Sequence, residues 1–513
     1  MKKITYISLS ILLAACQAPK EEKTEKKEIQ LKPYPEVKKD SIVDNYFGTE
    51  VADPYRWLEN DTSKETAEWV QAQNEVTFDY LAQIPYRDQI EDRLTELWNY
   101  ERLGTPFKRG KFYFFFKNDG IQNQSVLYYQ KSLDAEAEVL LDPNKLSDKG
   151  TTAINGLGFS KDAQYMSYGI SHAGSDWVEI HTMNLETKEE LEDIIKYVKF
   201  SGISWKADGF YYSAYEAPEN GSDYSAKNEF HSVYYHKIGT TQADDKLVYR
   251  DEKHPLRNVG AGVTDDEKYL IVSTSESTNG NGLKIKNLET DGELITIVND
   301  FDNDHSVIDH LGDGKFLVET NFEAPNGRLC IMDIKNPSKS NWETLIPEKE
   351  YVLRGAELAG GKLFASYMKD VKSKLEVYDL DGNYQYDIDL AGIGMASFSG
   401  DKEENKAFYS FTSYTQPTSI YSYDIENNES SLYFKPTTDF KSEDYITKQV
   451  FYSSKDGTKI PMFITHKKGI KMDGSNPTFL YGYGGFNISI TPSYSARNAV
   501  FFEQGGIYAV ANL

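Results

Sequence analysis

The feature that most constrains the fold is a short unit that recurs along the middle of the chain. Each unit begins with a tight polar turn, such as Asp313-Gly-Lys, and continues into an aromatic-rich strand. Seven units occur at intervals of roughly 45 to 60 residues, a period typical of propeller blades. One small sheet cannot bury both of its faces alone, but a ring of such sheets can. We therefore predict a seven-bladed β-propeller over residues 100–437, with strand anchors at Phe112, Tyr165, Phe210, Tyr269, Phe316, Leu363 and Phe408.

An irregular array of β-sandwiches is the alternative interpretation of these units. Aromatic residues make up 13% of the chain, with 37 Tyr and 26 Phe, and they fit the pleated surface of a strand well. This composition supports β structure but does not decide between the two architectures.

The segments on either side of the repeats have different patterns. Before them, Thr62-Ser-Lys-Glu65 has the sequence of a capping box, and apolar residues at helical spacing follow it. Residues 87–98 predict a second helix. After the repeats, Ser453-Ser-Lys-Asp-Gly457 indicates a hairpin. Two near-continuous apolar runs, 478–481 and 506–513, then predict strands that are covered on both faces.

The N-terminus has the pattern of an export signal. Residues 1–15 combine a basic start with an apolar core too short to span a bilayer, and we expect them to be a signal peptide. Leu13-Ala-Ala-Cys16 resembles the bacterial lipobox, which implies cleavage before Cys16 and lipidation of that residue. Residues 16–33, rich in Lys and Glu, then form a flexible tether. The expected location is the cell envelope, as a periplasmic or outer-membrane lipoprotein. The alternative is an ordinary signal peptide with a chance cysteine.

Charge and residue types exclude some partners and cofactors. The net charge of -24 argues against nucleic acid, because phosphate binding requires a basic face. The eight histidines are scattered, without the spacing of a metal site, so we expect no metal. Cys330 lies in an apolar stretch and is expected to be a buried structural thiol.

Several motifs in a fixed order carry a family resemblance. The most specific is the glycine-rich run Tyr481-Gly-Tyr-Gly-Gly-Phe486, which follows an apolar strand. From about Tyr34 onward the chain resembles the prolyl oligopeptidase (prolyl endopeptidase) family. The other matching segments are Asp53–Glu59, Gly120–Tyr128, Gly174–Trp177 and Lys455–Phe463.

The resemblance implies a seven-bladed β-propeller inserted into an α/β-hydrolase domain. Residues 34–99 would be the N-terminal helical part of the peptidase domain, and residues 438–513 the start of its catalytic part. The implied activity is serine-peptidase cleavage of short proline-containing peptides after proline, without a cofactor and as a monomer. The propeller would admit short peptides and exclude folded proteins.

Three residues correspond to functional positions of the family. Tyr483 resembles the oxyanion-hole tyrosine, whose phenol donates a hydrogen bond to the developing oxyanion. Phe486 resembles the phenylalanine of the proline pocket, where a flat ring suits a pyrrolidine. Phe200 matches a propeller aromatic that faces the substrate. The alternative for each is a core aromatic.

The catalytic triad has no counterpart in the sequence. No G-x-S-x-G elbow occurs, and His466 is the last histidine, so Ser489 and Ser493 receive no catalytic role. We therefore expect an incomplete hydrolase domain and no peptidase activity from these residues alone. Two other functions remain open. One is a non-catalytic propeller lipoprotein that binds peptides or glycans. The other is a sister serine peptidase such as oligopeptidase B, against which the Tyr481–Phe486 run argues.

Overall fold

The computed structural model describes residues 29–217, 227–290 and 292–512. The chain divides into two compact units, one ending at Asp92 and the other running from Arg93 to Leu513. The predicted signal peptide, Cys16 and most of the predicted tether lie outside the described residues. Within the described ranges, no helix is both long and apolar enough to cross a membrane.

The first unit contains a hairpin, a short 3-10 helix and a long α-helix. Within the Asp53–Glu59 motif, the Arg56 guanidinium forms an ion pair with Asp53 at 2.6 Å and another with Asp44 on the hairpin. This pairing holds the short helix against the hairpin. The elements are β1 (Val43–Tyr46), β2 (Thr49–Ala52), η1 (Arg56–Glu59) and α1 (Lys64–Ala82).

The predicted capping box at the start of α1 is wrong by one residue. Ser63, not Thr62, is the N-cap, and its hydroxyl accepts a hydrogen bond from the Thr66 amide at 3.1 Å. A serine at this position satisfies one of the amides that a helix start leaves unpaired. The predicted second helix is confirmed as α2 (Arg87–Trp98), which crosses the boundary between the units.

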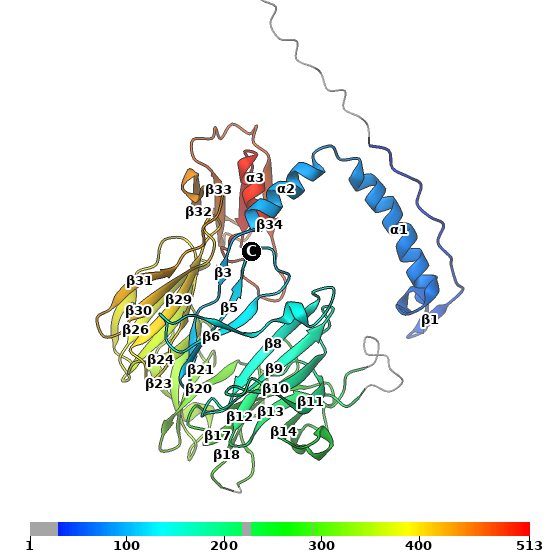
Figure 1. Cartoon of the computed structure of the whole chain (residues 1–513). Helices are drawn as coiled ribbons and strands as arrows, with labels where there is room; N and C mark the ends of the chain where they lie inside the picture. Colours follow the sequence, from blue (N-terminus) through cyan, green and yellow to red (C-terminus); the bar gives the residue numbers. More distant parts are fainter. Residues whose placement is uncertain (1–28, 218–226, 291, 513) are drawn as a thin grey trace, which may run out of the picture. The chain divides into compact units, whose positions relative to one another are not determined.

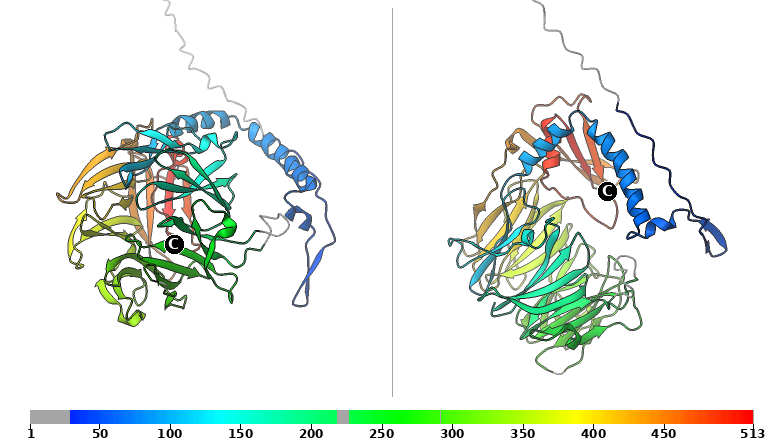
Figure 2. Two further views of the ribbon diagram at one scale, coloured as in Figure 1. Left: turned by 60° about the horizontal axis from the view of Figure 1, so that its bottom comes forward. Right: turned by 45° about the vertical axis from the view of Figure 1, so that its right-hand side comes forward.

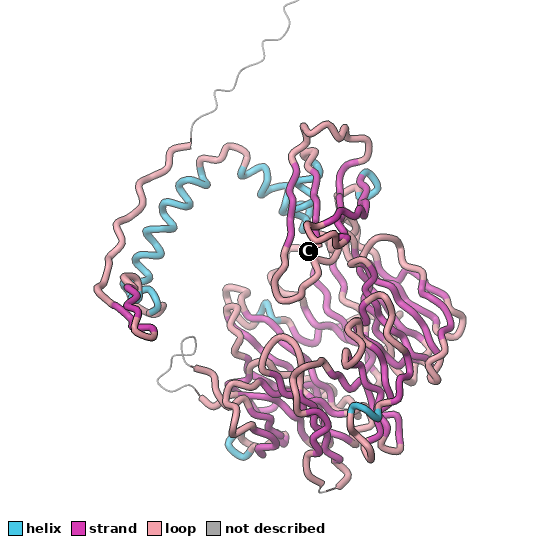
Figure 3. Tube along the Cα trace, turned by 180° about the vertical axis from the view of Figure 1, so that it is seen from behind, coloured by secondary structure: helices cyan, strands magenta, loops and turns pink. Residues whose placement is uncertain are grey.

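Antiparallel sheets make up most of the second unit (Figures 1 and 3). Four of them have four strands each in simple sequential order, one has five strands and one has eight. Figure 2 shows these sheets arranged around a common centre. The four-stranded sheets are β16 (Asn258–Val263) to β19 (Ile295–Val298), β20 (His305–Gly312) to β23 (Glu343–Ile346), β24 (Val352–Ala359) to β27 (Tyr384–Ile388), and β28 (Met395–Ser399) to β31 (Glu429–Phe434).

Between these outer strands lie the central strands β17 (Tyr269–Ser275), β18 (Gly282–Asn287), β21 (Lys315–Thr320), β22 (Arg328–Asp333), β25 (Lys362–Lys369), β26 (Lys372–Tyr378), β29 (Lys406–Thr412) and β30 (Ser419–Asp424). The five-stranded sheet contains β3 (Arg102–Leu103), β4 (Phe107–Arg109), β5 (Phe112–Asn118), β6 (Val126–Gln130) and β7 (Glu138–Leu141).

The eight-stranded sheet consists of two groups of four joined at one point. Among the described residues, strands of the two groups are in register only at Val198 and Ala214. The first group is β8 (Thr152–Phe159), β9 (Tyr165–His172), β10 (Val178–Asn184) and β11 (Glu190–Val198). The second is β12 (Ser204–Lys206), β13 (Gly209–Ala214), β14 (Ser232–Lys237) and β15 (Lys246–Arg250).

The predicted strand anchors lie at the starts of comparable strands. Each is within the first three residues of a strand that lies second in its group of four or five. Six of the seven are buried. The exception, Tyr165, is half-buried and stacks on Trp205 at 6.0 Å between ring centroids. The repeating sequence unit therefore corresponds to a repeating structural one.

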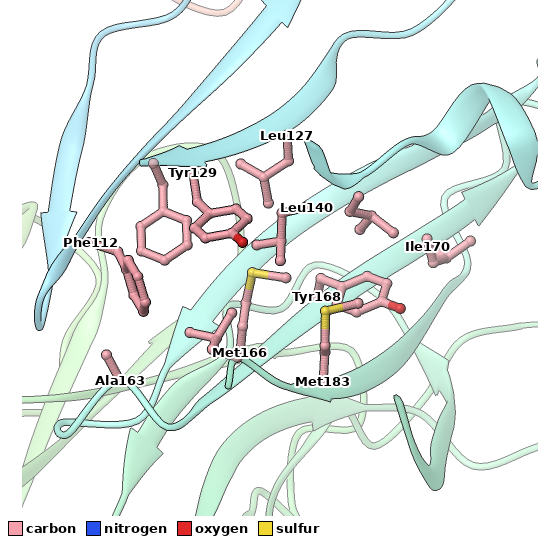
Figure 4. Close-up of a cluster of buried hydrophobic side chains, with 12 residues drawn as sticks. Phe112, Leu127, Tyr129, Leu140, Ala163, Met166, Tyr168, Ile170 and Met183 are labelled. Carbon is pink, nitrogen blue, oxygen red and sulfur yellow. The ribbon is translucent and has the colours of Figure 1, made fainter. Parts of the chain in front are cut away.

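The hydrophobic core is a series of clusters between consecutive sheets. Figure 4 shows one of them, in which Phe112, Leu127 and Tyr129 of the five-stranded sheet pack against Met166 and other residues of the next sheet. Such clusters lie between successive sheets from the five-stranded sheet to the sheet of β28–β31, as the propeller prediction requires. Cys330 is fully buried in another such cluster, which confirms its prediction as a structural thiol.

A mixed sheet follows the last of these antiparallel sheets, in the order β32-β33-β35-β34. The predicted hairpin is confirmed between β32 (Tyr445–Ser453) and β33 (Lys459–Lys467), and β34 (Thr478–Gly482) runs parallel to β35 (Ile507–Ala511). The helix α3 (Ala496–Glu503) connects the parallel pair. A parallel pair requires such a crossover, usually an α-helix. The prediction that both strands are covered on both faces is wrong for β34, all five residues of which are exposed, whereas β35 is largely buried.

Candidate active site

The candidate site is the loop that follows β34, residues 483–489. It leaves the carboxyl end of a strand that pairs in parallel with β35. In sheets with parallel strands, ligands commonly bind at the carboxyl ends of the strands. The position of the loop in the sheet is therefore one where function is often found.

The backbone of this loop turns sharply in an unusual conformation. Phe486 and Asn487 are consecutive non-glycine residues with φ of 55° and 56°, and the Ile488 amide donates to the Gly485 carbonyl at 3.2 Å. A Cβ at Gly485 would lie 2.9 Å from the Tyr483 hydroxyl oxygen. Glycine at 485 therefore allows the phenol to lie directly on the loop. Positive φ at non-glycine residues costs free energy and is concentrated at functional sites.

A buried asparagine holds the far end of the loop. The Asn512 Oδ1 accepts a hydrogen bond from the Ile490 amide at 2.8 Å, and its Nδ2 donates to the Ile490 carbonyl at 3.4 Å. The Asn512 amide itself donates to the Pro461 carbonyl on β33. With β34 paired to β35 on one side and Asn512 on the other, both ends of the loop are attached to the sheet.

The aromatic side chains of the loop are exposed. Tyr483 is 38% exposed and Phe486 is 71% exposed, so neither is a core residue of the described chain. The Tyr483 hydroxyl makes no hydrogen bond to any of the described residues. Its donor is therefore free for a ligand, and the Phe486 ring offers an uncovered apolar face.

Phe200 is also exposed, at 64%, in a strained turn between β11 and β12. Its φ is 51°, and the Lys199 ammonium lies over its ring at 5.2 Å and over Trp177 at 5.0 Å. The Lys199 carbonyl is hydrogen-bonded to His231 at 2.9 Å. No ring contact joins Phe200 to Tyr483 or Phe486 in the described parts of the chain, whereas Tyr483 and Phe486 lie three residues apart on one loop.

A cavity of about 370 Å³ adjoins the same loop. Asn487 lines it together with propeller residues from β20, β21, β24 and the turn after β21. Neither this cavity nor the Asn512 clamp was predicted, because both depend on residues far apart in the sequence. The one sequence feature that could have indicated the cavity is the position of Asn487 directly after Phe486.

The structure does not assemble a nucleophile from the described residues. His466 is buried on β33, and its Nδ1 is hydrogen-bonded to the Lys467 carbonyl at 2.8 Å. Neither Ser489 nor Ser493 is hydrogen-bonded to a histidine. Among the described residues, no group of histidine, cysteine or carboxylate side chains is arranged to hold a metal ion.

Comparison with known proteins places this fold and loop in a family. Residues 34–436 match the family model for the N-terminal β-propeller domain of prolyl oligopeptidase. The prolyl endopeptidase of Elizabethkingia meningoseptica is 48% identical over 94% of this chain and 68% of its own length. That of Dictyostelium discoideum is 32% identical over 94% of this chain and 73% of its own length.

Solved structures agree with these relatives. A solved prolyl endopeptidase structure superposes with a TM-score of 0.87, at 31% identity, over 94% of this chain and 71% of that one. Prolyl oligopeptidase B from Galerina marginata, bound to a 35-residue substrate, gives 0.86 at 29% identity over 93% of this chain and 72% of that one.

A β-propeller joined to a mixed sheet that carries an aromatic, glycine-rich loop defines a class of serine peptidases. Within that class, this chain belongs to the prolyl oligopeptidase family.

Proposed function

We propose that this chain supplies the propeller and the oxyanion-binding loop of a peptidase that cleaves short peptides after proline. The observation that carries the proposal is the loop itself. Tyr483 has a free hydroxyl and Phe486 has an exposed ring, three residues apart on one anchored turn. The named activity of the relatives supports the same conclusion.

The chemistry of the loop follows from its two side chains. When a serine attacks the carbonyl after proline, negative charge develops on the carbonyl oxygen. The Tyr483 hydroxyl would donate to that oxygen, and one such donor is worth about 3 kcal/mol in the transition state. Phe486 would pack on the proline ring. The serine, aspartate and histidine of this reaction have no counterpart among the described residues.

The proposed architecture is finer than the family assignment. We take the eight-stranded sheet as two blades, because its halves are in register at a single position among the described residues, which gives seven blades in total. We take β32–β35 with α3 as the beginning of an α/β-hydrolase sheet. We also propose that the protein acts as a monomer, which light scattering during gel filtration would test.

A chimera provides the sharpest test of the function. Residues 34–512 would be joined to the C-terminal segment of the Elizabethkingia meningoseptica relative, which is similar enough for the sheet to continue. The chimera should hydrolyse a Gly-Pro-linked chromogenic substrate and discriminate against Gly-Ala. The same residues without that segment should show no turnover. A folded chimera without proline preference would contradict the proposal.

The alternatives predict different results in the same assay. A non-catalytic propeller that binds peptides or glycans would give an inactive chimera even when it is folded. A sister peptidase such as oligopeptidase B would prefer a basic residue to proline before the cleaved bond. Parallel assays with Arg-linked and Pro-linked substrates therefore separate the three functions.

We also propose that Cys16 is lipidated and anchors the protein to a membrane of the cell envelope. The support is the sequence alone, in which a short apolar core ends directly at Leu13-Ala-Ala-Cys16. Cys16→Ser should move the protein from the membrane fraction to the soluble fraction. Unchanged fractionation of that variant would contradict the anchor.

A further inference from the structure

The cavity beside the candidate loop has the features of a second binding site. It holds about 370 Å³, within the size range of small-ligand pockets, and Asn487 of the loop forms part of its wall. The other walls come from β20, β21 and β24, which Figure 1 labels in neighbouring sheets of the propeller. A ligand that occupies it would lie next to the residue that follows Phe486.

Two charged side chains in this cavity have no polar partner. Arg354 on β24 is exposed, and its guanidinium makes no hydrogen bond or ion pair to any described residue. Glu319 on β21 also lacks such a partner. Arg354 acts on Glu319 only through space, where it opposes the effect of burial on the carboxyl. An arginine fork without a partner is a group that can hold a carboxylate with two hydrogen bonds.

A third unpaired group lies in the same wall. His305 is buried, and its Nδ1 is hydrogen-bonded to the Thr320 hydroxyl at 2.8 Å. Its Nε2 has no partner within the described chain. Buried polar atoms are rarely left unpaired in folded proteins, so each such atom calls for an explanation. Nε2 has almost no exposed surface, so a ligand in the cavity would reach it only after the side chain moved.

Two carboxylates, Asp304 and Glu319, line the cavity together with Arg354. Both carboxylate oxygens of Asp304 already accept hydrogen bonds, from the Gly280 amide at 2.7 Å and from Asn321 Nδ2 at 2.9 Å. Burial raises the pKa of Glu319, with a smaller contribution from Asp304, while Arg354 opposes the shift. An ionised Glu319 repels an anion in the cavity, so the Glu319→Gln variant bears directly on anion binding.

We infer that this cavity is a subsite for a carboxylate of the peptide substrate, held by the guanidinium of Arg354. The inference rests on the proposed function, since it assumes a peptide whose proline lies against Phe486. The carboxylate comes either from the C-terminus of a short peptide or from an acidic side chain. If the carboxylate is the C-terminus, the site would select short peptides, since only their C-terminus would reach Arg354.

Peptide binding to the chain itself tests this inference. The sequence holds no nucleophile elbow, so peptides can be titrated without turnover. The probes are N-terminally labelled Gly-Pro peptides with one to four added alanines, each as a free acid, as an amide, and as an amide ending in glutamate. At the best length, the free acid should bind roughly tenfold more tightly than the amide, as expected for a hydrogen bond to a charged group.

Variants of three residues assign the effect. Arg354→Gln should remove the difference between acid and amide. Arg354→Lys should keep part of it, because the charge remains while the fork is lost. Glu319→Gln should tighten binding of the acid. The control is Arg497→Gln on α3, an exposed arginine outside the cavity, which should leave the difference unchanged.

The outcomes separate the subsite from the proposed function. Equal binding of acid and amide at every length, or a difference that persists in Arg354→Gln, would overturn the subsite. Replacing the proline of the peptide by alanine tests the function instead.

If carboxylate preference is absent while proline preference is intact, only the subsite is refuted. If proline preference is absent while carboxylate preference is intact, only the function is refuted. No binding of any peptide would refute both. Binding of the glutamate amide like the free acid would identify any carboxylate as the ligand, whereas a response to the free acid alone would identify the C-terminus.

Discussion

Aromatic side chains are placed in opposite ways in two regions of the larger unit. In the propeller, anchors such as Phe210 and Phe316 are fully buried between sheets. In the loop after β34, Tyr483 and Phe486 are exposed on a turn with positive φ. The same residue types therefore stabilise the fold in one region and remain free for a ligand in the other. Residue type alone therefore does not separate a core position from a candidate ligand contact.

The largest expected effect concerns stability. Phe316→Ala removes a fully buried ring and leaves a cavity, which should lower the free energy of unfolding by about 3–5 kcal/mol. Phe486→Ala removes an exposed ring and should change it by less than about 0.5 kcal/mol. Urea unfolding followed by circular dichroism measures both. Similar losses of unfolding free energy in the two variants would mean that Phe486 belongs to a core, which would contradict the contrast between the two regions.

The next effect concerns rate and uses the active chimera. Tyr483→Phe keeps the ring and removes only the hydroxyl, so turnover should fall on the order of ten- to a thousand-fold, with binding less affected. Phe486→Ala should instead reduce the preference for proline over alanine. Tyr481→Phe, on β34 before the loop, is the matched control. Unchanged turnover in Tyr483→Phe would contradict the assignment of Tyr483 to the oxyanion hole.

A smaller effect concerns the attachment of the loop. Asn512→Ala removes both hydrogen bonds to Ile490, and leaving the amide unpaired should cost about 1–3 kcal/mol of stability. The loop should also become easier to open, so amide exchange at Ile490 should accelerate. Exchange that stays as slow as in the parent protein would show that the turn conformation does not depend on this clamp.

Much of the propeller was predictable because its information is local. Each unit carries its own turn and strand, and neighbouring units bury one another, so the anchors Phe112 to Phe408 could be placed from periodicity alone. The predicted cap of α1 was displaced by one residue, because Thr62 and Ser63 are both good caps and only the geometry of the turn selects between them.

The site was predictable only in part. Tyr483 and Phe486 were indicated by a specific motif, and local sequence would equally have allowed core positions. The Asn512 clamp and the cavity with Arg354 depend on pairings across more than twenty residues and, for the cavity, between the propeller and the loop. No local pattern in the sequence records such contacts.

The last prediction compares histidines within the propeller. His236 is fully buried. Burial alone would lower its pKa, but Asp245 at 2.7 Å from Nδ1 and Asp193 at 3.4 Å from Nε2 more than offset this, so its pKa is raised. Burial lowers the pKa of His305 to about 4, and that of His231 to about 4, since neither ring contacts a carboxylate.

These shifts contribute to stability with opposite signs. The contribution of His236 is fully present below the unfolded pKa of about 6.5 and is lost as pH rises through its raised folded value. The two neutral histidines act in the other direction, because the unfolded chain binds more protons as pH falls from about 6.5 toward 4. Titration of the ring carbon-bound protons by NMR should show His236 charged above pH 6.5 and His305 neutral near pH 5.

His236→Gln should remove the loss of stability between neutral and mildly alkaline pH, while His305→Gln should leave that loss in place. Identical pH profiles for the two variants would show that the carboxylate pair does not hold His236 charged.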